Sequence, residues 1–176
     1  MELKQAIMER RSVRQFTAQG VTRAELEQVL EAGIWAPCAG NLQEWEFVCV
    51  TRPEMIGKMK VVSPGVFWKP QAIVVVCVDS TKAGEAFGAR NAGRWSIFDC
   101  AMAAQNMMLR AYDLGIGSCA IGSFNALAVR ELLDIPEHVQ AELLLLLGRY
   151  ETLPKPPPRK TEVIHWERFG SHGGNK

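Results

Sequence analysis

One helical segment, from about Trp95 to Tyr112, places the strongest constraint on how this chain can fold. It is apolar on nearly every face, and Asp99 and Arg110 are its only charged residues. A helix of this kind must be buried, yet one sheet and a few amphipathic helices can hardly cover it in a chain of 176 residues. A homodimer would supply the missing cover. The sequence therefore predicts a homodimer.

Composition places the chain among ordinary soluble globular proteins. Apolar residues make up 48% and charged residues 22% of the chain, which is typical of a folded protein rather than a disordered one. We treat residues 1–176 as a single domain, with residues 151–176 as an extended C-terminal arm. The net charge of +1 disfavours nucleic-acid binding, since the arginines near the N-terminus are only a local concentration.

The cysteines and histidines show no metal-site pattern. The five cysteines include no C-x-x-C pair and no metal-type spacing to the three histidines, so we expect reduced thiols and no metal. Residues 1–5 mix acid and base and lack the apolar core of a secretory signal. The longest apolar runs are far shorter than the ~20 residues of a membrane span. We therefore expect a cytoplasmic protein without a membrane segment.

Hydrophobic spacing predicts a mixture of helices and strands. Residues 72–78 form a continuous apolar run rich in β-branched residues, as expected for a central strand covered on both faces. Thr22 and Glu25 form a capping box that opens a helix, and Pro37 stops it. Residues 80–93 lack strong periodicity and predict a mobile connection. The remaining predicted helices are 2–9, 54–60, 95–112 and 126–133, and the remaining predicted strands are 47–50 and 141–147.

The C-terminal arm begins with a proline-rich segment. Residues 153–160 contain four prolines, which predict an extended chain that cannot pair as an interior strand. An apolar group follows, formed by Val163, Ile164, Trp166 and Phe169. We expect this arm to lie along a surface and to embrace a partner subunit, and we expect the glycine-rich end, residues 171–176, to fray.

Two short motifs carry the chemistry. Arg10-Arg11-Ser12-Val13-Arg14 gathers three guanidinium groups and a hydroxyl, which suits bidentate recognition of a phosphate. The segment from Pro37 to Gln43 predicts a tight loop with exposed backbone groups, which can hydrogen-bond the edge of a flat heterocycle. Taken alone, the first motif is usually a solvated helix face and the second an ordinary helix stop. Together they indicate a flavin site.

Three glycines, Gly115, Gly117 and Gly122, follow the long apolar helix and free the backbone for a close approach. They do not form a dinucleotide-binding fingerprint. That fingerprint needs a strand before the glycines and a helix after them, whereas Gly115-x-Gly117 follows a helix.

Four segments follow one another in order along the chain. They are Arg10-Arg11-Ser12-Val13-Arg14-x-Phe16, Ala36-Pro37-Cys38-Ala39-Gly40-Asn41-Leu42-Gln43-x-Trp45-x-Phe47, the apolar helix with Asp99, Gln105 and Asn106, and Gly115-Ile116-Gly117-Ser118-Cys119. Gly148, the proline-rich stretch and Arg159 close the pattern. In this order and over nearly its full length, the chain resembles the nitroreductase family of FMN-dependent oxidoreductases.

The resemblance implies an α+β fold in which a central, mainly antiparallel sheet is wrapped by helices. It also implies an intertwined homodimer, with the C-terminal extension lying on the partner and with FMN bound between the subunits. Four residues would hold the cofactor's phosphate and ribityl chain: Arg10, Arg11, Ser12 and Arg159. Arg14 would approach the pyrimidine edge of the flavin, opposite Pro37, Cys38, Ala39 and Asn41 of the other subunit. Ile121 and Gly122 would bring backbone amides near the central ring.

The function implied by the resemblance is ping-pong hydride transfer. NADH or NADPH would reduce FMN, and a flat, electron-poor small molecule such as a nitroaromatic or a quinone would then be reduced. The cofactor supplies the chemistry, so no side chain is expected to act as an acid, base or nucleophile. His138 and His165 are accordingly expected to be structural.

Other functions remain open at this stage. One is an FMN-binding protein without turnover, such as a flavin reservoir or a redox sensor using Cys38. Another is a protein that keeps the fold and has lost the cofactor, and a third is a reductive enzyme of the same family with another substrate. Two departures from the family bear on these alternatives. Cys38 stands where a small serine is usual, and the chain is short before the central helix, which favours an open active site.

Overall fold

A computed structural model describes residues 1–171 of the chain, apart from the side chains at positions 80, 83, 87 and 89–92. Within these residues, a sheet of four antiparallel strands forms the centre in the order β1-β2-β4-β3. The strands are β1 (Trp45–Val50), β2 (Ala72–Asp79), β3 (Gly117–Ile121) and β4 (Val139–Gly148). The predicted α+β class and antiparallel sheet are therefore confirmed.

The central strand β2 shows how the sequence produces the layers. All residues from Ala72 to Val78 are buried, and β2 pairs with β1 on one side and with β4 on the other. Successive side chains of a strand point to opposite faces. Accordingly, Val74 and Val76 join one hydrophobic core, whereas Ile73 and Val75 join the other. The predicted central strand, covered on both faces, is confirmed.

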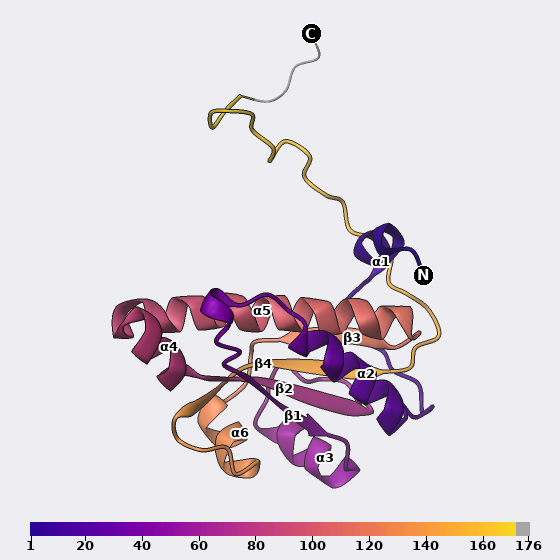
Figure 1. Ribbon diagram of the computed structural model, residues 1–176. Helices are drawn as coiled ribbons and strands as arrows, with labels where there is room; N and C mark the ends of the chain where they lie inside the picture. The colour runs from indigo at the N-terminus through magenta and orange to yellow at the C-terminus, as the bar shows by residue number, and fades with distance from the viewer. Residues whose placement is uncertain (172–176) are drawn as a thin grey trace.

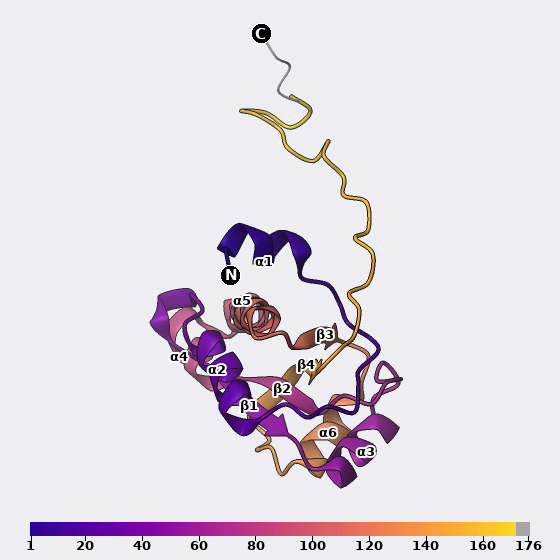
Figure 2. The same cartoon turned by 90° about the vertical axis from the view of Figure 1, so that its right-hand side faces the viewer.

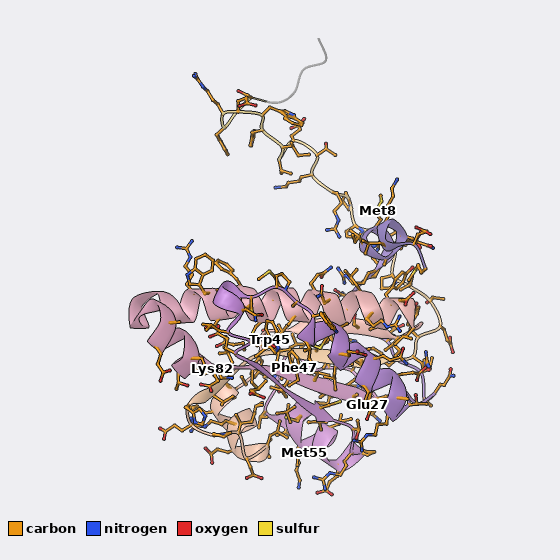
Figure 3. All side chains as sticks on the ribbon, in the orientation of Figure 1. Met8, Glu27, Trp45, Phe47, Met55 and Lys82 are labelled. Carbon is orange, nitrogen blue, oxygen red and sulfur yellow. The ribbon has the colours of Figure 1, made fainter. Side chains whose placement is uncertain are left out.

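Helices cover both faces of the sheet (Figures 1 and 2). On one face lie α2 (Arg23–Ile34) and α5 (Ala89–Asp113), with Met107 of α5 fully buried beneath α2. On the other face lie α3 (Pro53–Val61) and α6 (Ala126–Leu132). The short helix α1 (Leu3–Glu9) crosses the C-terminal end of α5. Figure 3 labels Trp45 and Phe47 on β1, whose side chains enter the core under α2 and α5.

The predicted start of α2 is confirmed in detail. The Thr22 hydroxyl accepts a hydrogen bond from the Glu25 backbone N–H at 3.3 Å, and the Glu25 carboxylate accepts one from the Thr22 N–H at 2.9 Å. These bonds satisfy backbone donors that the first turn of a helix leaves without partners. The capping box thereby fixes where α2 begins.

The prediction of a mobile connection over residues 80–93 is wrong. The chain forms α4 (Ser80–Phe87) there and then begins α5 at Ala89. The side chain of Asp79 caps α4 by accepting a hydrogen bond from the Thr81 N–H at 3.1 Å, and Gly88, with φ of 75°, separates the two helices. The Asp79 cap and the packing of α4 on α5 therefore produce helices where the sequence predicted an irregular connection.

Two further features bear on the sequence predictions. Sequence analysis did not predict β3, because its first residue is a glycine and it has only five residues. The single chain leaves part of the long helix α5 uncovered, as expected from the sequence, since Trp95 and Phe98 are each 45% exposed. One side of this apolar helix thus has no cover among residues 1–171.

The C-terminal arm is extended, as predicted. Residues 151–171 contain no helix or strand, and the arm runs past α1 and then away from the body of the molecule (Figures 1 and 2). Residues 172–176, for which we expect fraying, lie outside the described part of the chain. None of the described helices is long and apolar enough to cross a membrane.

Candidate cofactor site

The segment Arg10 to Arg14 is fixed to the edge of the sheet. It leaves α1 at Arg10, and the Val13 N–H donates to the Ser118 carbonyl of β3 at 2.9 Å. Ser12 and Ser118 form a parallel β-bridge at this point. A Cβ at Gly117 would lie 2.7 Å from the Val13 Cβ, so only glycine allows this approach. Of the glycines predicted to permit a close approach, Gly117 therefore does so.

Positive charge gathers at this edge without negative partners. The pKa of Arg10 is lowered, first by burial and then by the neighbouring charges of Arg11 and Arg159. Within residues 1–171, none of these three guanidinium groups forms an ion pair with a carboxylate. The chain thus brings Arg159 of the distant C-terminal arm to the arginines near the N-terminus. We call Arg10, Arg11, Ser12 and Arg159 the cationic cradle.

Several polar atoms in and beside the cradle are buried and lack partners. They include Nε of Arg10 and of Arg11, and Oγ of Ser118, which have no hydrogen-bond partner in the described structure. Arg11 uses one terminal nitrogen to donate to the carbonyls of Met8 at 2.7 Å and of Arg10 at 2.8 Å. A buried donor without a partner costs roughly 1–3 kcal/mol. An anion with several oxygens, such as a phosphate, would remove that cost.

Arg14 lies next to the cradle against an aromatic ring. Its guanidinium carbon is 5.8 Å from the centroid of the Trp68 ring, a cation–π contact that restrains the side chain. The buried thiol of Cys119 lies close to the same groups. Burial raises the pKa of Cys119, whereas the charges of Arg14 and Arg10 and a hydrogen bond with Ser12 oppose that rise. Sequence analysis missed Trp68, because only the fold brings it to Arg14.

The end of β3 offers exposed backbone. Ile121 is buried, whereas Gly122 is exposed, and a Cβ added there would meet no atom within 4 Å. The loop before β2 holds the backbone just after β3 in place, since the Gly65 N–H donates to the Ser123 carbonyl at 2.9 Å. The backbone at Gly122 is therefore open to a flat ligand.

The second motif forms a tight loop, residues 38–43, which we call the edge loop. Gly40, Asn41 and Gln43 all have positive φ, of 59°, 54° and 49°. These left-handed conformations need support where the residue is not glycine. Two bonds provide it: the Gln43 N–H donates to Cys38 Sγ at 3.4 Å, and the Gln43 amide donates to the Asn41 side-chain oxygen at 3.3 Å. Cys38 thus acts as a structural acceptor inside the loop.

Two buried carboxyl groups lie behind the edge loop, and sequence analysis assigned neither of them to the site. The Asp99 carboxylate of α5, only 2% exposed, accepts a hydrogen bond from the Ala39 N–H at 3.0 Å. Glu44 follows the loop directly and is 1% exposed. Charged residues in an apolar helix and beside a loop were a signal that could have identified them, because such groups are buried only when something compensates them.

Within one chain, the edge loop lies against the middle of α5, whereas the segment that leads into the cradle lies near the C-terminal end of that helix. Asp99 anchors the edge loop, whereas α1, which leads into the cradle, is held near Asp113 by the bond from the Met1 ammonium at 3.2 Å. Asp113 lies fourteen positions after Asp99 in the helix, which is about 21 Å along the axis. Figure 1 shows α1 at the C-terminal end of α5 and α4 at its N-terminal end. A single chain therefore does not bring the two motifs together.

Comparison with known proteins gives a consistent result. A sequence profile described as the Nitroreductase family matches residues 7–62 and 58–149. A protein of Archaeoglobus fulgidus, provisionally named NADH dehydrogenase/NAD(P)H nitroreductase, is 33% identical over 153 residues, covering 84% of each chain. The FMN reductase (NADPH) of Bacillus subtilis is 29% identical, covering 92% of this chain and 72% of its own. The crystal structure of nitroreductase A from Vibrio parahaemolyticus superposes with a TM-score of 0.85 at 26% identity, covering 97% of this chain and 77% of that one.

Proposed function

The chain is an oxidoreductase of the Nitroreductase family, and we propose that it binds FMN between two subunits and uses NADH or NADPH to reduce a small molecule. The observation that carries this proposal is the cationic cradle with its unpartnered buried donors. Bound FMN would accept a hydride from the nicotinamide and give it up to the acceptor. The protein would hold and orient FMN and would place positive charge beside it.

We assign the phosphate and ribityl chain of FMN to Arg10, Arg11, Ser12 and Arg159. A phosphate there would receive charge-assisted hydrogen bonds, including bonds to the Nε donors that otherwise stay unsatisfied. Because Arg10 and Arg159 lie 149 positions apart in sequence, folding of the C-terminal arm is part of forming this site.

We assign the flavin ring to the space beside Arg14, with the backbone at Ile121 and Gly122 near its centre. Reduced flavin carries negative charge at its pyrimidine edge, so a guanidinium at this place would stabilise the reduced form. The contact with Trp68 holds that guanidinium in position. Pro37, Cys38, Ala39 and Asn41 would approach the same edge from the partner subunit.

The homodimer is the part of the proposal that brings the two motifs together. The uncovered side of α5 includes Trp95 and Phe98, and Trp35 at the end of α2 is 79% exposed. A groove of about 410 Å³ runs between α1, α2 and α5 and has Leu3, Ala6, Trp35 and Leu109 among its lining residues. The arm carries exposed apolar residues of its own, among them Trp166 at 63% and Phe169 at 94%. In a dimer, the uncovered side of α5 and the apolar residues of the arm would both be buried.

Ping-pong kinetics follow if reductant and acceptor use the same open place on the ring in turn. Nitroaromatics and quinones are our candidate acceptors, because both are flat and electron-poor. No side chain is assigned as an acid, base or nucleophile. All five cysteines are free thiols in the structure, which suits a protein of the cytoplasm.

The visible absorption spectrum of the purified protein tests the proposal. It should show bound flavin that bleaches without oxygen when NADH or NADPH is added, and whichever nucleotide bleaches it is the donor. A flavin that binds and is bleached by neither nucleotide would overturn the reductase assignment. A protein that takes up no FMN even when FMN is added would overturn the cofactor site itself.

A further inference from the structure

Glu44 is the least expected residue in the neighbourhood of the edge loop. Its side chain is 1% exposed, and one carboxyl oxygen, Oε2, has no hydrogen-bond partner in the described structure. The backbone fixes its position, because the Glu44 carbonyl accepts a hydrogen bond from the Asp79 N–H at 2.8 Å. An ionised carboxylate in such a place is costly, whereas a neutral carboxylic acid is much less so.

The groups around Glu44 are mostly acidic. Asp99 faces it from α5 and Asp79 from the end of β2, and Lys82 on α4 is the single cation among the described side chains around it. Figure 3 labels Lys82 on α4. The buried hydroxyl of Ser96, also on α5, forms a hydrogen bond with the Glu44 carboxyl group. Apart from this serine, no described group satisfies Glu44, and two of its three charged neighbours repel a negative charge.

Asp99 connects this acidic group to the edge loop. Its carboxylate accepts the Ala39 N–H at 3.0 Å and is the described side chain that ties the loop to α5. The loop has little freedom to adjust, since Gly40, Asn41 and Gln43 already occupy left-handed conformations. A change of charge behind Ala39 would therefore act directly on the loop.

We propose that Glu44 and Asp99 are positioning residues that hold one proton between them, and that FMN binding weakens when the pair loses this proton. The inference rests on the proposed function, because it assumes that the edge loop contacts FMN. It adds two residues outside the cofactor's direct contacts that set how the loop is presented.

The direction of the effect follows from the contacts of each carboxyl group. Burial raises the pKa of Glu44, and it raises the pKa of Asp99 as well, although the Ala39 N–H opposes the rise at Asp99. In the proposed pair we assign the proton to Glu44, whose Oε2 has no hydrogen-bond partner in the described structure, and Asp99 keeps its bond to the loop. As pH rises, Glu44 ionises beside the Asp99 carboxylate, and two like charges then face each other in a site closed to water.

The direct test is the FMN affinity as a function of pH. Dissociation constants for the natural protein and for Glu44→Gln are measured by flavin fluorescence from about pH 5 to pH 9. Glutamine has the same shape and cannot ionise, and titration of FMN itself cancels in the ratio of the two constants. We expect the dissociation constant of the natural protein, divided by that of Glu44→Gln, to rise about tenfold from the acid to the alkaline end. This rise corresponds to one pKa unit of coupling. A ratio that stays flat overturns the proposal.

Two further variants control for a general effect of removing charge and for a folding failure of Glu44→Gln. Glu46→Gln removes the same charge from an exposed position on β1 and should leave the pH profile of FMN affinity unchanged. Asp99→Asn keeps an oxygen that can accept the Ala39 N–H and removes the charge, so it should flatten the profile as Glu44→Gln does. A normal profile in Asp99→Asn would contradict the pairing even if Glu44→Gln failed to fold.

A readout without FMN separates this proposal from the proposed function. The raised pKa of Glu44 means that the folded state holds its proton to higher pH than the unfolded state, so folding stability falls as pH rises through that interval. Glu44→Gln should therefore gain stability relative to the natural protein with rising pH in urea unfolding of the FMN-free protein. This gain in a protein that binds no FMN would retain the carboxyl pair and refute only the cofactor site. No gain would refute the pair.

Discussion

The C-terminal end of α5 and its N-terminal half show opposite ways of handling charge. At its C-terminal end, the cationic cradle holds three arginines that have no carboxylate partner among the described residues, and two of their Nε donors are unsatisfied there. At its N-terminal half, the edge loop is satisfied by its own bonds and by Asp99. The first region has buried donors left for a ligand, whereas the bonds of the second come from the chain itself. A cofactor bound between them would thus owe most of its affinity to the cradle and its placement to the loop.

The largest expected effect is on the cradle. Arg10→Ala or Arg159→Ala each removes a charge-assisted contact of about 1.5–3 kcal/mol, so each should weaken FMN binding roughly 10- to 100-fold. Equilibrium dialysis or flavin fluorescence measures the change. Arg23→Ala is the matched control, because Arg23 is exposed and pairs only with Glu27 on the surface of α2. Unchanged FMN affinity in both cradle variants would remove the phosphate assignment.

The next largest effect is expected from a change at Gly117, where the cradle is attached to the sheet. Gly117→Ala would place a Cβ 2.7 Å from that of Val13, and we expect it to cost about 1–3 kcal/mol of unfolding free energy and to loosen FMN. The same substitution at Gly57, inside α3 with no atom within 4 Å of the new Cβ, should instead stabilise the protein by up to about 1 kcal/mol. Chemical denaturation measures the change in unfolding free energy of each variant. Changes of the same sign would contradict the close approach of Gly117 to Val13.

Part of the fold and of the site could be predicted from the sequence. Most of the parts that could not be predicted depend on contacts between distant segments. The β2 run and the Thr22 box are local signals, and local signals predicted their elements correctly. Helix α4 has a local cap at Asp79 that we did not recognise in the sequence, whereas the short strand β3 depends on its pairing with β4. The same holds in the site: the arginine motif was readable, whereas the contact of Trp68 with Arg14 and the burial of Glu44 arise only when distant segments fold together.

Arg14 should affect the redox chemistry more than the binding. Arg14→Ala removes the positive charge proposed at the flavin edge, so the midpoint potential of bound FMN should fall by about 30 mV, equivalent to ~1.4 kcal/mol for a two-electron couple. FMN affinity should change less than in the cradle variants. Spectroelectrochemical titration measures the potential, and Arg14→Lys, which keeps the charge, should recover part of it. A potential that is the same in all three proteins would place Arg14 away from the ring edge.

The smallest effect is expected far from both regions. Thr22→Ala removes the capping bond of α2 and should lower the unfolding free energy by about 1 kcal/mol. FMN affinity should not change, because α2 carries neither the cradle nor the edge loop. Thermal unfolding and FMN titration of the same preparation check both statements, and a loss of FMN affinity would show that the two regions are less local than we describe.

The most direct test of the central claim is complementation between two defective subunits. One variant combines Arg10→Ala and Arg159→Ala, and the other carries Asn41→Val, which puts a β-branched residue at a φ of 54°. Both homodimers should bind FMN weakly, whereas their heterodimer, purified with two different tags, would pair one intact cradle with one intact edge loop. We predict tight binding of one FMN per heterodimer. A heterodimer that binds FMN no better than its two parents would contradict a site built from both subunits.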